Sequence, residues 1–267
     1  MAKLNQYETV KFSRIYALGA ARGDLVVTND EIAGPIESSD EWIRRRTGIV
    51  TRRRASKDLS LMDMAVAASK EAIEKAGINP SEIGAVLFST ITHPFQTPSA
   101  ATLLAELVGA NPAPAYDISA ACAGYCYGIA QADALVRSGV AKYVLVVGAE
   151  KLSDIIDPTD RTISFLLGDG AGAAIVGPSD FPGISPTVWG SDGSQWGAVS
   201  MTSSLLDFRD GKTRPIEPGL ECLVDEFPFK LADGRTGVDG QSRAQILKVI
   251  GNAIVPEVGA TFIQAYL

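Results

Sequence analysis

Residues 117–148 read DISAACAGYCYGIAQADALVRSGVAKYVLVVG, and this stretch decides the fold class. Its middle part, residues 122–137, has the apolar spacing of a helix and stops before Gly139. The run that follows, residues 143–148, is rich in valine and predicts a buried strand. A helix that leads directly into a buried strand is the repeating unit of an α/β protein.

The same alternation occurs on both sides of this stretch. Ser60 and Asp63 have the spacing of a capping pair at the start of a helix. Residues 85–90 and 173–176 are short apolar runs that predict buried strands, and residues 99–108 predict a further helix. The sequence therefore predicts an α/β fold with a largely parallel sheet and helices on both of its faces.

This pattern divides the chain into two parts. Residues 1–178 hold the alternating elements and are expected to form the first domain. Residues 179–267 form the second part, in which the pattern weakens from about residue 192 and residues 207–240 are expected to be loop or irregular. Apolar spacing of helical character returns over residues 245–263 but is interrupted by a glycine and a proline. We expect this part to be the start of a second domain that is shortened or divergent.

Composition excludes several classes of protein. The chain has 267 residues, of which 46% are hydrophobic and 21% charged, as in a globular protein with a substantial core. A net charge of −7 argues against nucleic acid as a partner. Residues 44–46 and 52–54 are all arginine, and the plainest interpretation of these runs is a solvated face. Without a leader-like N-terminus or an apolar run of about 18 residues, we expect a cytoplasmic protein that does not bind membranes.

The cysteines carry the first indication of chemistry. Cys122, Cys126 and Cys222 are odd in number and lack metal-ligand spacing, so neither a disulfide framework nor a metal site is predicted. Small residues surround Cys122 where a strand-like segment gives way to a helix, which places the thiol at a helix N-terminus. There the helix dipole favours the thiolate, the form that attacks a thioester carbonyl. The alternative is a small buried hydrophobic residue, and we assign Cys126, one turn later, to packing of that kind.

The glycine-rich segment GDGAGA at residues 168–173 is not a dinucleotide loop. It lacks the third glycine at the required spacing, and it precedes a strand instead of opening a helix. We therefore expect no nicotinamide or flavin cofactor.

Four windows together resemble one family. They are SSDEWI at 38–43 with RTGI at 46–49, the segment around Cys122, DPTDR at 157–161, and GDGAGAA at 168–174. In order and separation they are similar to β-ketoacyl-acyl-carrier-protein synthase III over about residues 12–200. The resemblance implies a thiolase-like duplicated α/β sandwich, of which the second half would be incomplete here, and a homodimer. It also implies an acyltransferase that joins an acyl-CoA starter to malonyl-acyl carrier protein by decarboxylative condensation, with no further cofactor.

Site residues follow from the same resemblance. Cys122 matches the acylated cysteine, whereas Trp42, Arg46 and Arg161 match positions that contact the nucleotide end of CoA, with Ser38 at a neighbouring contact. Guanidinium groups pair with phosphate and stack on aromatic rings, so these residue types suit a nucleotide. The alternatives are partial core burial for Trp42 and an ion pair with a neighbouring aspartate, Asp157 or Asp160, for Arg161.

Thr97 is a predicted substrate-binding residue of another kind. The resemblance implies that its segment reaches across the dimer into the partner's acyl channel, where threonine leaves more room than the phenylalanine of some relatives. The alternative is that Thr97 caps the helix beginning near residue 99.

The match fails at two family segments that donate hydrogen bonds to the malonyl thioester, one with a histidine and one with an asparagine. The sequence contains neither, and its one histidine, His93, is predicted to be part of a loop. Two alternatives therefore stay open: a non-catalytic partner or regulatory relative, and an acyltransferase that uses an oxygen or nitrogen nucleophile.

Overall fold

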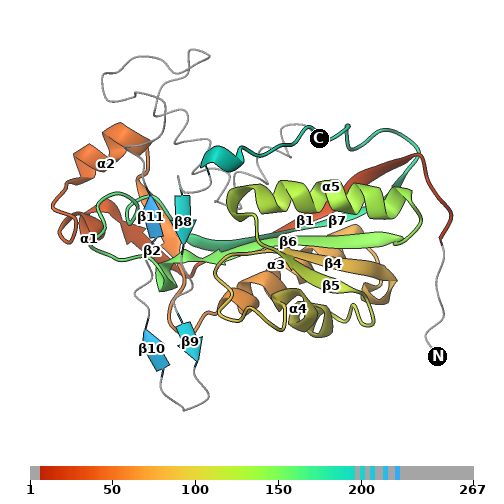
Figure 1. Cartoon of the computed structure of the whole chain (residues 1–267), viewed down its shortest axis with the longest axis horizontal. Coiled ribbons are helices and arrows are strands. Elements are labelled where there is room, and N and C mark those ends of the chain that lie inside the picture. Colours follow the sequence, from red (N-terminus) through yellow and green to blue (C-terminus); the bar gives the residue numbers. More distant parts are fainter. Residues whose placement is uncertain (1–6, 196–198, 202–204, 208–212, 216–219, 223–267) are drawn as a thin grey trace.

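A five-stranded mixed sheet forms the centre of the described chain (Figure 1). The computed structural model describes residues 7–195, 199–201, 205–207, 213–215 and 220–222. The sheet has the order β1-β7-β6-β4-β5, with β1 at Phe12–Arg22, β4 at Ile83–Ser89, β5 at Ala115–Ile118, β6 at Tyr143–Lys151 and β7 at Asp169–Ser179. Strand β4 is parallel to β5 and β6, whereas β7 is antiparallel to β6 and β1. A largely parallel sheet is therefore confirmed, except for β7.

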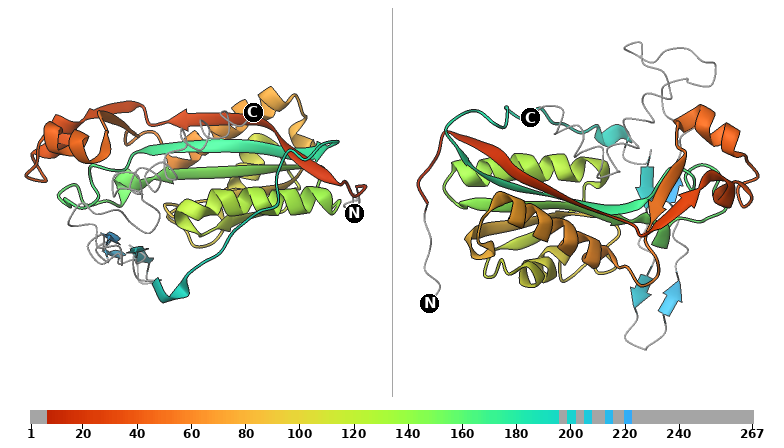
Figure 2. Two further views of the ribbon diagram at one scale, coloured as in Figure 1. Left: turned by 90° about the horizontal axis from the view of Figure 1, so that it is seen from above. Right: turned by 180° about the vertical axis from the view of Figure 1, so that it is seen from behind.

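Helices cover both faces of this sheet, as the sequence predicts. They are α1 Asn29–Ala33, α2 Asp40–Thr47, α3 Leu61–Ala76, α4 Ala100–Val108 and α5 Gly124–Arg137, with single 3₁₀ turns η1 Pro80–Glu82, η2 Ala121–Ala123, η3 Leu152–Asp154 and η4 Gly193–Gln195. Figures 1 and 2 show α5 on one face and α3 with α4 on the other. Ser60 and Asp63 form the predicted capping box of α3, and Gly77 ends that helix with φ 65°.

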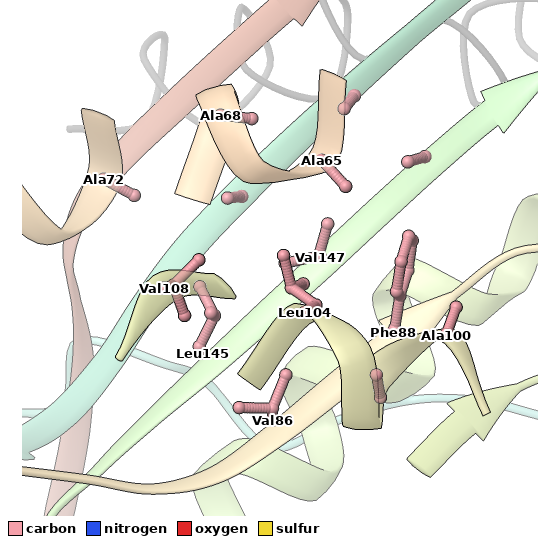
Figure 3. Close-up of a cluster of buried hydrophobic side chains, with 14 of the residues drawn as sticks. Ala65, Ala68, Ala72, Val86, Phe88, Ala100, Leu104, Val108, Leu145 and Val147 are labelled. Carbon is pink, nitrogen blue, oxygen red and sulfur yellow. The ribbon is translucent and has the colours of Figure 1, made fainter. Parts of the chain in front are cut away.

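The alternation of side chains along β6 explains why one strand contributes to two cores. Leu145 and Val147 pack with residues of α3 and α4, as Figure 3 shows. Val144 and Val146 point to the other face, where they pack with α5. Successive strand residues face opposite sides of a sheet, so the valines of this run are buried on both faces. The sheet is therefore a rigid support for the loops at its ends.

Short strand pairs accompany the sheet. Strand β2 (Leu25–Thr28) pairs with β3 (Thr51–Arg54), and α1 and α2 lie between them in sequence. Strand β8 (Val199–Met201) pairs with β11 (Leu220–Cys222), and β9 (Leu205–Asp207) pairs with β10 (Thr213–Pro215). The prediction that residues 207–240 are irregular is therefore wrong at β10 and β11, because three-residue strands are too short to show a period in sequence.

Two predictions lie wholly or partly outside the described residues. The helical pattern over residues 245–263 is not described, so it stays a prediction. The domain boundary near residue 178 falls at the end of β7, and the duplication of the sandwich stays a prediction as well.

Candidate active site

Cys122 lies at the head of α5, as its sequence setting predicts. The chain leaves β5, turns at Ala121 with a left-handed φ of 43°, and makes the 3₁₀ turn η2 before α5 begins at Gly124. A Cβ atom on Gly124 would stand 2.0 Å from the Ser89 hydroxyl oxygen, so only glycine lets the helix start this close to β4. The partly buried thiol is therefore held beside the end of the sheet by a strained turn and a close contact.

The charge environment of Cys122 differs from the expectation. Burial raises the pKa of the Cys122 thiol, a hydrogen bond from its own backbone N–H acts in the opposite direction, and the negative charge of Glu150 raises the pKa further. The predicted thiolate-favouring effect of the helix N-terminus is therefore opposed by desolvation of the thiol. Cys126 is exposed, so its assignment to buried packing is wrong.

Asp117, at the end of β5, caps the neighbouring helix. Its carboxylate accepts hydrogen bonds from the backbone N–H groups of Ala100 at 2.8 Å and Ala101 at 2.9 Å. The N-cap of α4 is Ser99, whereas Thr97 is exposed in the preceding loop. The interpretation of Thr97 as the cap of this helix is therefore wrong, and its role in an acyl channel stays a prediction.

Trp42, Arg46 and Arg161 meet on one surface, which we call the indole platform. The guanidinium carbon of Arg46 lies 4.5 Å from the centre of the Trp42 ring, and that of Arg161 lies 5.1 Å from it. The Trp42 ring also packs edge-on against the ring of Phe165, with 5.3 Å between their centres. The alternative of partial burial for Trp42 is therefore confirmed, and so is its position beside the two arginines. An aromatic ring with two guanidinium groups is a surface suited to a nucleotide and its phosphates.

Arg161 does not form the ion pair considered as its alternative role. Asp157 accepts hydrogen bonds from the backbone and hydroxyl of Thr159, and Asp160 does the same for Thr162. In the described part of the chain, no salt bridge joins Arg161 to either aspartate. Its charge is therefore available to a ligand.

A buried arginine supports the platform. Arg52 donates to the side-chain oxygen of Asn29 at 2.5 Å and to the backbone carbonyl of Phe165 at 3.1 Å, and so ties β3 to the segment that carries Arg161. Arg54 donates to the carbonyl of Ser164 at 2.8 Å. Burial lowers the pKa of Arg52 to about 10, so the group stays charged at neutral pH. The interpretation of the arginine runs as a solvated face is therefore wrong for Arg52.

His93 lies in a loop, as the sequence predicts, and Ser38 lies just before α2. Ser38 precedes α2, and its buried hydroxyl oxygen has no hydrogen-bond partner in the described part of the chain. His93 lies in the loop after β4, with its ring 5.5 Å from that of Phe95. Within the described residues, no helix is long and apolar enough to cross a membrane, and no group of three potential ligands is arranged for a metal ion.

The glycine-rich segment at residues 168–173 enters β7 directly, which confirms that it precedes a strand and does not open a helix. The carboxylate of Asp169 accepts from the backbone N–H groups of Ala55 at 2.7 Å and Ser153 at 3.0 Å, and from the Ser153 hydroxyl. This buried carboxylate therefore joins three segments. Sequence reasoning missed it, together with Asp117 and Glu150, because each acts through partners distant in sequence.

Comparison with known proteins agrees with this architecture. The family described as 3-oxoacyl-[acyl-carrier-protein (ACP)] synthase III matches residues 116–193. β-Ketoacyl-[acyl-carrier-protein] synthase III of Kocuria rhizophila is 56% identical over 209 residues, which are 78% of this chain and 59% of that protein. Synthase III 1 of Streptomyces coelicolor is 47% identical over 235 residues, which are 88% of this chain and 68% of that protein.

Solved structures show the same likeness. The priming β-ketosynthase of the R1128 polyketide biosynthetic pathway has a TM-score of 0.70 and 47% identity, covering 72% of this chain and 58% of its own. Synthase III from Thermus thermophilus has a TM-score of 0.68 and 37% identity, covering 78% of this chain and 65% of its own.

The sheet, its covering helices and the cysteine at the head of α5 define a protein of the thiolase fold. Within that class, the chain belongs to the β-ketoacyl-[acyl-carrier-protein] synthase III family. The chain spans about three fifths of the length of the first relatives, 59% of the Kocuria protein and 64% of its counterpart in Tropheryma whipplei.

Proposed function

We propose that the chain is a condensing acyltransferase in which Cys122 carries the acyl group. The thiol attacks the carbonyl carbon of acyl-CoA, CoA leaves as its thiol, and a thioester forms on the sulfur. Malonyl-acyl carrier protein then loses CO₂, and the resulting carbanion attacks that thioester and releases the cysteine thiolate. The product is a 3-ketoacyl thioester, the first intermediate of fatty acid synthesis.

The observation that carries this proposal is the placement of Cys122. A thiol in a strained turn between β5 and α5, with Gly124 against Ser89, is fixed in position and partly exposed to a substrate. Effective attack requires a nucleophile held in such a fixed geometry. The names of the relatives, which describe synthases acting on acyl carrier protein, support the choice of reaction and partner.

The indole platform supplies the second argument. Figure 1 shows α2, which carries Trp42 and Arg46, toward the same end of the sheet as the N-terminal end of α5. We propose that the platform binds the nucleotide end of acyl-CoA while the pantetheine arm reaches Cys122. Ser38, whose hydroxyl is without a partner in the described chain, is proposed as a neighbouring contact.

Family membership suggests the remaining parts of the proposal. We propose a cytoplasmic homodimer in which the loop at Thr97 enters the acyl channel of the partner subunit. Thr97 is exposed, and the neighbouring Phe95 is 63% exposed, as an inserted loop requires. Neither family segment that assists decarboxylation occurs in residues 1–267, so we expect this polypeptide to be acylated efficiently but to condense slowly.

A burst experiment tests the proposal. Acetyl-CoA is mixed with the polypeptide, released CoA is measured by chromatography, and radiolabelled malonyl-acyl carrier protein is then added. We expect one equivalent of CoA per chain, abolished in Cys122→Ala, and little ketoacyl product. CoA release that continues without malonyl-acyl carrier protein and requires an amine or alcohol acceptor would instead indicate the other acyltransferase. A complete absence of CoA release would indicate a non-catalytic relative.

A further inference from the structure

Glu150, near the end of β6, is a partly buried carboxylate that the proposed reaction does not use. It accepts hydrogen bonds from the backbone N–H of Ile91 at 2.9 Å, the Thr92 hydroxyl at 2.5 Å and the Thr90 hydroxyl at 3.3 Å. Thr92 is fixed in turn by the backbone N–H of Lys151 at 3.0 Å. The loop after β4 therefore holds this carboxylate in one place.

The packing of α5 on the sheet places the head of this helix at the carboxyl ends of β4 and β6. A Cβ atom on Gly128 would lie 2.8 Å from Val146, and one on Gly148 would lie 3.3 Å from the ring of Tyr125. At the head of α5, a Cβ atom on Gly124 would meet Ser89, which pairs with Gly148 in the sheet. Cys122, two residues before Gly124, therefore lies near the carboxyl ends of β4 and β6, the end of the sheet that carries Glu150.

The direction of the side chain agrees with this placement. Val144 and Val146 face α5, and Glu150 has the same parity along the strand. Glu150 therefore points to the face of the sheet that α5 covers. Burial is the main cause that raises the pKa of the Cys122 thiol, and the negative charge of Glu150 acts in the same direction.

We propose that Glu150 is a positioning residue that sets the charge state of the Cys122 thiol. This inference rests on the proposed function, in which Cys122 is the nucleophile. An ionised Glu150 disfavours the thiolate, whereas a protonated Glu150 permits it, because two neighbouring negative charges repel in a partly buried site. The carboxyl thus keeps the resting cysteine protonated and limits its reaction with unintended electrophiles.

Glu150 changes its protonation state near neutral pH. Burial raises the pKa of Glu150 to about 7, although the hydrogen bonds from Thr92, Ile91 and Thr90 act in the opposite direction. As pH rises through 7, Glu150 becomes negative and the pKa of Cys122 rises with it. The thiolate fraction therefore increases with pH more slowly than for an isolated thiol.

Among the described residues, no other charged group pairs with Glu150. Tyr125 on α5 packs against Gly148, and burial raises the pKa of that phenol, so Tyr125 is neutral. Lys151 is directed elsewhere, to the Ser56 carbonyl and to Asp154. The paired residue on β7 is Gly170, which carries no charge. No salt bridge of the described residues includes Glu150.

The test is the pH profile of Cys122 alkylation by iodoacetamide, measured on the full chain with the adduct located by peptide mass. In Glu150→Gln we expect a lower apparent pKa for Cys122 and faster alkylation at pH 8, because the gain in thiolate is only partly offset by the weaker nucleophilicity of a more acidic thiol. Glu150→Asp, which keeps the charge, should resemble the wild type. Glu82→Gln, an exposed carboxylate paired with Lys142, is the matched control and should leave the profile unchanged.

Two results would overturn the inference. The first is coincident profiles for the wild type and Glu150→Gln when both melt at the same temperature. The second needs no variant and decides the matter if Glu150→Gln does not fold: a wild-type rate that rises tenfold per pH unit from pH 5.5 to 8.5 without a shoulder near 7. Alkylation does not use acyl-CoA, so failure of the proposed function alone would leave these profiles unaltered.

Discussion

Removing one guanidinium from the indole platform should weaken CoA binding without affecting the cysteine. Arg46 is exposed on α2, and its guanidinium carbon lies 4.5 Å from the Trp42 ring. Arg45 is its neighbour on the same helix, is also exposed and has no contact with that ring among the described interactions. Arg46→Ala and Arg45→Ala therefore change the net charge equally but differ at the platform.

The expected magnitude follows from the contacts that a ligand would gain. The contact of the Arg46 cation with the Trp42 ring, about 0.5–1 kcal/mol at an exposed site, is present before CoA binds and is not counted. A charge-assisted hydrogen bond to phosphate contributes about 1.5–3 kcal/mol. Loss of Arg46 should therefore cost about 1.5–3 kcal/mol, which is roughly a tenfold to hundredfold increase in the Kd for CoA. Arg45→Ala should change the Kd by less than about twofold at 0.15 M salt, because screening removes most of its influence.

Isothermal titration calorimetry with CoA, at two salt concentrations, measures this difference. The rate of Cys122 alkylation serves as the control for folding and should be the same in both variants. Equal weakening by the two substitutions would show that CoA responds to the general charge of α2 and that the platform is not its site.

Three further predictions concern the site. Gly124→Ala should destabilise the protein by about 1–3 kcal/mol in thermal unfolding, because its Cβ would collide with the Ser89 hydroxyl, whereas Gly34→Ala, with nothing within 4 Å, should be neutral; equal melting temperatures would refute the close contact. Thr97→Phe should abolish acylation by lauroyl-CoA and preserve acylation by acetyl-CoA, since each buried CH₂ contributes about 0.8 kcal/mol; parallel losses would contradict a channel role. Ketoacyl product from residues 1–267 should be at least about a hundredfold slower than acylation, and comparable rates would show that other donors assist decarboxylation.

The elements that were predicted best are those defined by residues close together in the sequence. The capping box of Ser60 and Asp63 and the left-handed Gly77 define α3 from residues close in sequence. The valine run of β6 is recognisable because it is buried on both faces. Strand β1 was missed because several small residues interrupt its apolar pattern and its register with β7 shifts between Ile15 and Ala17. The direction of β7 depends on pairing and not on composition.

In the candidate site, too, some features could be predicted from the sequence and others depend on the assembled fold. The position of Cys122 follows from small residues before a helix, and the grouping of Trp42, Arg46 and Arg161 follows from family resemblance. The acidity of the thiol does not follow, because it depends on burial and on Glu150, which lies on a strand whose neighbours are set by the fold. Long-range electrostatic partners of this kind become visible only when the sheet is assembled.

Acylation of Cys122 by acyl-CoA is the central claim, and one mass measurement tests it most directly. The polypeptide is incubated with acetyl-CoA and quenched in acid, its intact mass is recorded, and the adduct is located by peptide fragmentation. We predict one acetyl group per chain, on Cys122, and none in Cys122→Ala. An adduct on Cys126 or Cys222, or one that persists in Cys122→Ala, would contradict the claim.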